Sequence, residues 1–473
     1  MPGGYDNIYY NYILEHSYLW IKGIHNLFWS APINYYDIHS VAQADSLIGI
    51  APIYWIIRLL IKNPFSAFQI LFVFLCILNY STFYFLMKKL KLNRLPCAAG
   101  ALIFAFSTLR FFNYDNFPCF SQFLSVIAII FLLQVNTRNK NIINHFYFLL
   151  SSIFLILQFY TNFAIGFFTI FCALFSILFS LLPKNSRDIV IDFIRKFYKY
   201  ILFYLFVTFI MLLPMAYHFS CLGYYNPLSN ILSNLANYTI WIRSLSMIDN
   251  IINLHFDYVG LKANLSSVSL GLFTTVVSLY ALYNTQKVKG VSLLTLLFIV
   301  LISSGYSAIY FWKIFYYFSF GIESLESVNS VSFIALFIIS IGISLFFQNI
   351  KNKFILFSVL ILVIFEQISY NNDFNSSLKN NFISKQDFIQ SINKIKVEDK
   401  IINIKFNALN EKEFGKNDIK IKKLKAQKIA DLTAMWVGLR ENKPVLNNYM
   451  NKSKPQKSYT AKEIDLKVDY NQI

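Results

Sequence analysis

Ten long apolar runs divide the chain between residues 64 and 370, and short polar connections separate them. The runs are 65–87, 96–112, 118–135, 145–161, 163–183, 200–217, 268–284, 290–305, 331–347 and 354–370. A helix needs about 20 apolar residues to cross a bilayer. The runs are continuous and do not alternate apolar with polar residues, which predicts about ten transmembrane helices and not the strands of a barrel.

The composition agrees with a membrane protein. Of 473 residues, 56% are hydrophobic and 14% are charged, whereas a soluble domain has roughly 25% charged residues. The net charge of +18 does not indicate a nucleic-acid partner, because the basic residues gather in every second short connection. These connections are the segments 88–94, 138–140, 184–199, 287–289 and 351–353.

The same distribution of charge predicts the orientation. The five connections hold fifteen lysines and arginines, against three in the opposite loops 218–267 and 306–330. Positively charged loops stay in the cytoplasm. We therefore expect a multi-pass protein of a bacterial cytoplasmic (inner) membrane, with both termini on the outer side.

Three regions follow from these patterns: an outer loop over 1–63, a transmembrane core over 64–370, and a tail over 374–473. In the tail, Asp399–Phe406 alternates like a half-buried strand, and Ser384–Ile395 has the pattern of a short helix with Ser384 as its cap. The predicted fold is an all-α polytopic membrane protein with a small C-terminal α/β extracytoplasmic domain.

The outer loop opens with an amphipathic pattern. On a helix over residues 7–22, Asn7, Asn11, Glu15, Tyr18 and Lys22 fall within an arc of about 80°. This predicts a helix along the membrane surface, with its polar stripe turned away from lipid. Asp6 precedes the first turn, where free backbone N–H groups stabilise a carboxylate. Spacing alone is equally consistent with a helix cap.

Several short motifs, in this order and spacing, resemble those of bacterial GT-C-type membrane glycosyltransferases, closest to the branch that includes YfhO-like proteins. The residues that carry the resemblance are Asp6, Asn11, Glu15-His16, Ala44 to Gly49, Phe104 to Ser107, Glu366 and Asn442 to Tyr449. The resemblance implies transfer of a sugar from a polyprenyl-phosphate carrier to a glycan, lipid or protein acceptor on the outer face of the membrane.

The resemblance also implies roles for particular residues. Asp6 matches the catalytic carboxylate, and a carboxylate is a suitable base for an acceptor hydroxyl. Asp45 is the second catalytic candidate, as a partner of the base or as a ligand of a divalent metal ion, Mg or Mn. Asn11, Glu15 and His16 are candidates for binding acceptor or phosphate. Solvated surface positions are the alternative for Asp45, Glu15 and His16.

The cations expected for the carrier phosphate differ from those of related sequences. The segment 325–331, where related sequences carry arginines, has none. Arg110, Arg243 and Lys313 are the basic residues near the outer ends of the runs or in the later outer loops, so Arg243 and Lys313 are candidates for substrate binding.

Two other functions stay open on the sequence: transport of a lipid-linked glycan or small solute, and a non-catalytic, degenerate relative that acts as a scaffold. Ten spans also place residue 1 on the outer side without a preceding span. We therefore expect a further span upstream of Met1, which would deliver Asp6 to the outer membrane surface.

Overall fold

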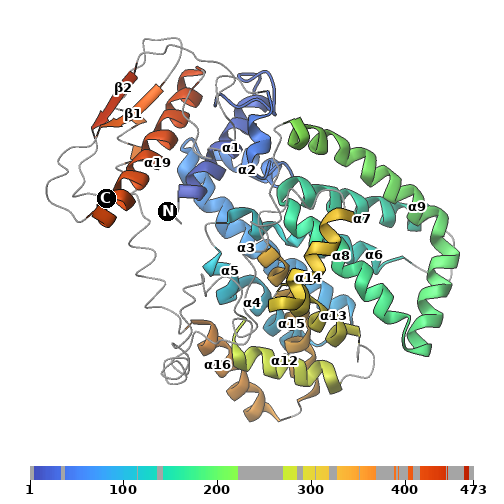
Figure 1. Ribbon diagram of the computed structural model, residues 1–473. Helices are drawn as coiled ribbons and strands as arrows, with labels where there is room; N and C mark the ends of the chain where they lie inside the picture. Colours follow the sequence, from blue (N-terminus) through green and yellow to red (C-terminus); the bar gives the residue numbers. More distant parts are fainter. Residues whose placement is uncertain are drawn as a thin grey trace.

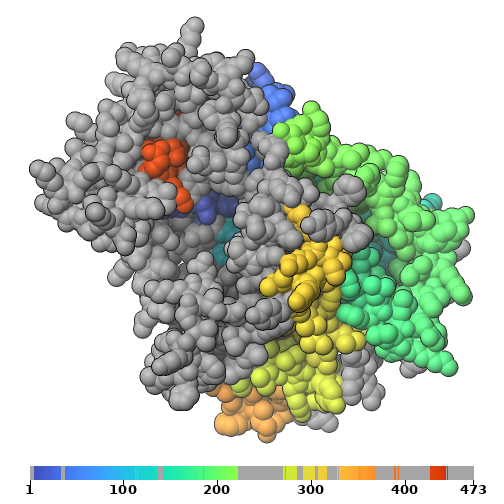
Figure 2. All heavy atoms as spheres, in the orientation of Figure 1, coloured from blue at the N-terminus to red at the C-terminus, as the bar shows by residue number. Residues whose placement is uncertain are grey.

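The structure is a computed structural model. It describes residues 5–33, 38–113, 116–135, 142–221, 270–284, 291–303, 305–318, 328–350, 352–368, 388–389, 392–393, 403–407, 416–443, 445 and 463–467. Most of the described residues are helical (Figure 1). Helices α1 (Tyr5–Ile21) and α19 (Lys416–Glu441) lie together at one end of the molecule, and α9 (Lys184–Cys221) covers one side (Figure 2).

Every predicted apolar run contains at least one helix where the structure describes it. The elements are α3 (Pro64–Lys89), α4 (Arg94–Phe106), α5 (Thr108–Phe112), η2 (Phe117–Ser121), α6 (Phe123–Leu132), α7 (Ile142–Thr161), α8 (Phe163–Ser180), α9, α12 (Leu272–Asn284), α13 (Val291–Ser303), α15 (Ser332–Asn349) and α16 (Lys353–Ile368). Among the described residues, five helices are long and apolar enough to cross a membrane: α3, α7, α8, α9 and α15. The other runs form shorter helices, so the expected ten spans are confirmed in part.

The structure corrects three boundaries. The run 96–112 is not one helix, because Ser107 is extended, with ψ 151°, between α4 and α5. The connection 184–199 is helical and continuous with α9, where Lys196 pairs with Asp192 one turn earlier at 2.7 Å. The expected loop 306–330 begins with helix α14 (Gly305–Phe318). Trp312 of this helix is buried, and its indole N–H donates to the Ile302 carbonyl at 2.6 Å.

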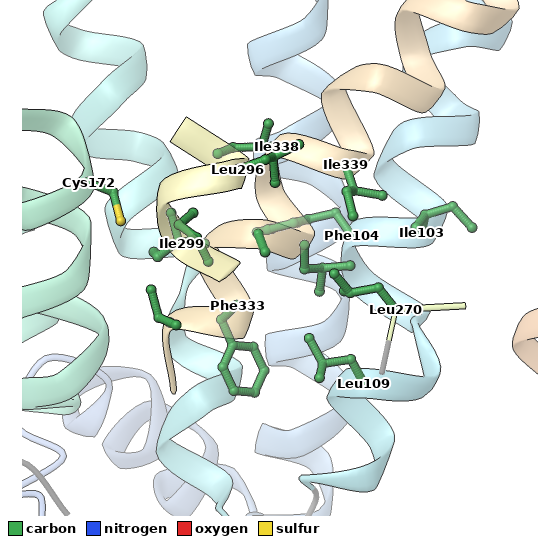
Figure 3. Close-up of a cluster of buried hydrophobic side chains, with 14 of the residues drawn as sticks. Ile103, Phe104, Leu109, Cys172, Leu270, Leu296, Ile299, Phe333, Ile338 and Ile339 are labelled. Carbon is green, nitrogen blue, oxygen red and sulfur yellow. The ribbon is translucent and has the colours of Figure 1, made fainter. Parts of the chain in front are cut away.

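The main apolar core lies between α4, α12, α13 and α15. Phe104 of α4 stacks on Phe83 of α3 at 4.8 Å, and Phe337 of α15 meets both rings edge-on. Figure 3 shows this core with side chains from α4, α5, α8, α13 and α15. Gly100 and Gly342 let the helices approach closely, since a Cβ at either position would collide with Ser344 or Ser278 of the neighbouring helix.

A second apolar core joins the start of the chain to its tail. Trp436 of α19 stacks on Phe65 at 4.7 Å, and Tyr12 of α1 meets the Trp436 ring edge-on at 6.0 Å. Helix α2 (Ala51–Leu60), which the sequence pattern did not predict, packs on α1 and α3. Residues separated by more than 370 positions therefore share one core.

The described part of the tail contains α19 and two short strands. Strand β1 (Asn403–Asn407) overlaps the strand predicted at Asp399–Phe406 and pairs in parallel with β2 (Glu463–Lys467). Helix α19 lies between the strands in sequence and packs on β1, as in a βαβ connection. In the helix predicted over 384–395, the described residues 388–389 and 392–393 are helical. The α/β domain as a whole remains a prediction.

Candidate active site

The first turn of α1 holds the leading catalytic candidate. Helix α1 begins at Tyr5, and Asp6 is exposed in its first turn. A carboxylate there is stabilised by the free N–H groups of the helix start, so the local sequence explains both the helix and the presence of an acid. Exposure leaves the Asp6 carboxylate within reach of a substrate from outside.

The helix predicted from the polar stripe is present, but its stripe is buried from Asn7 to Tyr18 and is exposed only at Lys22. Asn7, Asn11 and Glu15 are all buried, and α1 packs against α2, α3, η2 and α19. Protein therefore covers the stripe over these three residues, which do not face water. The interpretation of Glu15 and His16 as solvated surface positions is wrong.

Glu15 is fixed by a partner that the sequence did not single out. The Arg58 guanidinium donates from Nε to Glu15 Oε2 and from Nη2 to Oε1, both at 2.7 Å. The Tyr54 hydroxyl donates to Glu15 Oε2 at 2.8 Å and lies 3.3 Å from Asn11 Oδ1. A two-point guanidinium–carboxylate pair of this kind is geometrically specific. Asn11 and Glu15 are thus brought together, in a network that joins α1 to α2.

His16 is held by a second internal network. Its Nε2 lies 2.8 Å from the Phe28 carbonyl, and its Nδ1 lies 2.6 Å from His25 Nδ1. A carbonyl only accepts, so His16 carries its proton on Nε2, and His25 donates from Nδ1 to His16 Nδ1. Burial, followed by the neighbouring His25, lowers the pKa of His16 to about 3. Neutral His16 therefore fastens the segment after α1 onto that helix.

Asp45 lies at the start of α8. Its Oδ1 accepts from the Phe163 backbone N–H at 3.1 Å, and its Oδ2 accepts from the Asn162 side-chain amide at 3.0 Å. Asn162 in turn accepts from the Ile165 N–H at 2.8 Å and caps α8. A carboxylate at a helix N-terminus is stabilised in this way. This placement explains Asp45 structurally, and its catalytic role remains a prediction.

The described residues do not fit a divalent metal ion. Both oxygens of Asp45 accept hydrogen bonds from the protein, and no group of three or more His, Cys, Asp or Glu side chains converges among the residues that the structure describes. A requirement for Mg or Mn stays a prediction.

The remaining binding candidates are not brought to α1. Lys313 is exposed on α14, and α14 packs on α13 while α1 packs on α2, α3, η2 and α19. Arg243 lies outside the described residues. Among the described residues, no contact between helices places Lys313 in a shared site with Asp6.

Two charged residues within the apolar runs serve the fold. Arg110 is fully buried and donates to the carbonyls of Phe104 and Cys119, at 3.0 and 2.9 Å, and to Gln122 at 2.8 Å. Glu366 of α16 accepts from the backbone N–H groups of Phe273 and Thr274, both at 2.8 Å, at the start of α12. The Arg110 guanidinium and the Glu366 carboxylate each join neighbouring segments through hydrogen bonds, which is a structural role and not that of a proton carrier in a transporter.

One basic residue beside Tyr5 was not singled out in the sequence. The Lys428 ammonium of α19 lies 5.9 Å from the centre of the Tyr5 ring, next to Asp6 in the chain. The sequence signal is only a lysine-rich stretch within 416–428. Nothing in that stretch indicates which lysine meets α1, because the contact depends on how α19 packs.

Comparisons with known proteins give one structural similarity. No family model matches the chain, and no curated protein sequence matches it. The fold is similar to the crystal structure of the Archaeoglobus fulgidus oligosaccharyltransferase in complex with Zn and sulfate, with a TM-score of 0.46 and 12% sequence identity. The similarity covers 94% of this chain and 58% of the archaeal chain, so this chain spans less than two thirds of that protein's length.

Proposed function

We propose that the protein is a membrane glycosyltransferase that moves a sugar from a polyprenyl-phosphate carrier to an acceptor on the outer face of the cytoplasmic membrane. The observation that carries the proposal is the position of Asp6, which matches the catalytic carboxylate in the resemblance and is exposed in the first turn of α1.

The proposed reaction balances with Asp6 as the base. Asp6 takes the proton of an acceptor hydroxyl while the acceptor oxygen attacks the anomeric carbon of the sugar. The bond between that carbon and the carrier's phosphate oxygen breaks, and polyprenyl phosphate leaves with the bonding electrons. The motifs that resemble GT-C-type glycosyltransferases support this donor class, and the exposed position of Asp6 supports its role.

A non-catalytic scaffold is the second candidate. It is favoured by the fact that Glu15, His16 and Asp45, all candidates from the sequence, are used in internal contacts. Under this alternative Asp6 is simply a favourable acid in the first turn of a helix.

One experiment separates these functions. Membranes with the full chain are incubated with polyprenyl-phosphate sugars that carry a radiolabel in the sugar, next to membranes without the chain. Chain-dependent transfer of label to a glycan, lipid or protein supports the glycosyltransferase. Uptake of label that is still attached to its carrier would contradict the glycosyltransferase and support a transporter. No chain-dependent change at all would favour the scaffold.

A further inference from the structure

Helix α2 carries its apolar residues on the outside. Its exposed residues are Pro52, Ile56, Leu59 and Leu60, and at about 3.6 residues per turn they fall within an arc of about 100°. Ile56, Leu59 and Leu60 are 63%, 69% and 82% exposed. All four residues of this arc are apolar. A helix that faces water has the opposite pattern, with polar and charged side chains on its exposed face.

The polar groups of α2 are used inside the protein. Tyr54 is fully buried and donates to Glu15 Oε2 at 2.8 Å, and the Arg58 guanidinium pairs with the same carboxylate. The indole N–H of Trp55 donates to Ser17 Oγ of α1 at 3.0 Å. Tyr54 and Arg58 lie on the side of the helix opposite the apolar arc. These contacts fix the rotation of α2, so the arc faces away from α1.

Helix α2 lies at the end of a helix that is long and apolar enough to cross a membrane. It packs on α3 and lies beside α1 (Figure 1). A short segment joins α2 to α3, and Asn63 in that segment caps α3 by accepting from the Phe65 N–H at 2.9 Å. Ile70, Val73 and Ile77 of α3 are exposed apolar residues as well. With 10 residues, α2 has half of the about 20 residues that a span requires.

We infer that α2 is a membrane-binding helix that inserts Ile56, Leu59 and Leu60 among the acyl chains at the surface of the bilayer, next to α3. An exposed arc of apolar residues fits hydrocarbon and not water. Lys62, just beyond the helix, is exposed, and a lysine at this depth extends its ammonium to the lipid headgroups. The sequence pattern predicted a surface helix over 7–22, but that helix is largely buried, and α2 takes the position at the lipid.

Insertion gives the Glu15–Arg58 ion pair a further role. One side of α2 lies in lipid, and the other side is bound to α1 through this pair. The depth of α2 in the bilayer therefore sets the distance between the membrane and α1, which carries Asp6 in its first turn. This role is the same whichever reaction the protein catalyses, so the inference stands apart from the proposed function.

Spin labels on the full chain in phosphatidylcholine–phosphatidylglycerol vesicles test the inference. Cys221, the exposed cysteine, is replaced by serine, and the other four cysteines are buried. Labels are attached to Ile56→Cys and Leu60→Cys, to Val73→Cys on α3 as the lipid control, and to Asp192→Cys on α9 as the water control. Their collisions with oxygen, which concentrates in hydrocarbon, and with a water-soluble nickel chelate are measured. At Ile56→Cys and Leu60→Cys we expect the ratio of oxygen to chelate collisions to match that at Val73→Cys and to exceed that at Asp192→Cys several-fold.

Two results would overturn the inference. Collisions with the chelate at Ile56→Cys and Leu60→Cys as frequent as those at Asp192→Cys would place the apolar arc in water. Few collisions with either reagent would mean that protein covers the arc, either a second copy of this chain or another partner. Thermal unfolding of each labelled variant checks that it is folded, and Leu59→Cys, on the same arc, replaces a variant that does not fold.

Discussion

Glu15 and Arg58 form a two-point ion pair between α1 and α2, with both N–O distances at 2.7 Å. The side chains are only 7% and 11% exposed. Tyr54 adds a third hydrogen bond to the carboxylate. The pair joins a helix that carries the catalytic candidate to a helix that the sequence pattern did not predict.

Breaking this pair should destabilise the protein. Arg58→Met leaves the Glu15 carboxylate buried without its counter-ion, so we expect a loss of about 3 kcal/mol in the free energy of unfolding. The double variant Glu15→Gln with Arg58→Met should recover part of that loss. Denaturant unfolding in detergent measures both.

The exposed pair Lys196–Asp192 on α9 is the control for this comparison, with side chains 40% and 56% exposed. Lys196→Met should change the unfolding free energy by less than about 0.5 kcal/mol, because water screens that pair. Equal effects at the two pairs would contradict the structural role given to Arg58.

Asp6 is expected to be required for transfer and dispensable for folding. Because its carboxylate is exposed in the first turn of α1, Asp6→Asn should change stability by no more than about 0.5 kcal/mol and should abolish transfer of labelled sugar. Abundance in membranes and thermal unfolding are measured alongside transfer. Asp192→Asn, which changes another exposed acid, on α9, is the control. Full transfer by Asp6→Asn would remove Asp6 from the chemistry.

Asp45 distinguishes a cap from a catalytic acid. Asp45→Ala removes both hydrogen bonds to the start of α8, and we expect a cost of about 1–2 kcal/mol. Asp45→Asn keeps one acceptor oxygen and should retain most of the stability and most of the transfer activity. Abolished transfer in a fully stable Asp45→Asn would instead assign Asp45 to the reaction.

His16 should make stability depend on pH. Its pKa is about 3 in the folded protein, below the ordinary value of about 6.5. Between these values the unfolded chain binds more protons. The contribution of His16 is therefore fully present above about pH 6.5 and falls as the pH decreases, by up to about 1.4 kcal/mol per pH unit.

Thermal unfolding in detergent between pH 8 and pH 4 checks this sign. His16→Gln stays neutral at every pH, so its stability should change less with pH than that of the wild type. Above pH 7, where His16 is neutral in the folded and the unfolded protein, the two should respond to pH in the same way. A slope as steep in His16→Gln as in the wild type would place the proton-sensitive group elsewhere.

Local pattern alone determined much of this protein. Each of the ten apolar runs contains a helix where the structure describes it, because a continuous apolar segment satisfies its backbone hydrogen bonds in a helix. The helix at Tyr5–Ile21, with Asp6 in its first turn, and a strand over Asn403–Asn407 also follow from periods of 3.6 and 2. These features depend on neighbours in the sequence.

Packing between distant segments decided the rest. Periodicity placed Asn11 and Glu15 on one face of α1, but only the tertiary structure covers that face with Tyr54 and Arg58. Asp45 caps a helix that begins 118 residues later, and Lys428 reaches Tyr5 from the other end of the chain. A sequence period fixes the face on which a side chain lies, whereas its partner depends on which helices pack together, and that is set by the shape of the whole core.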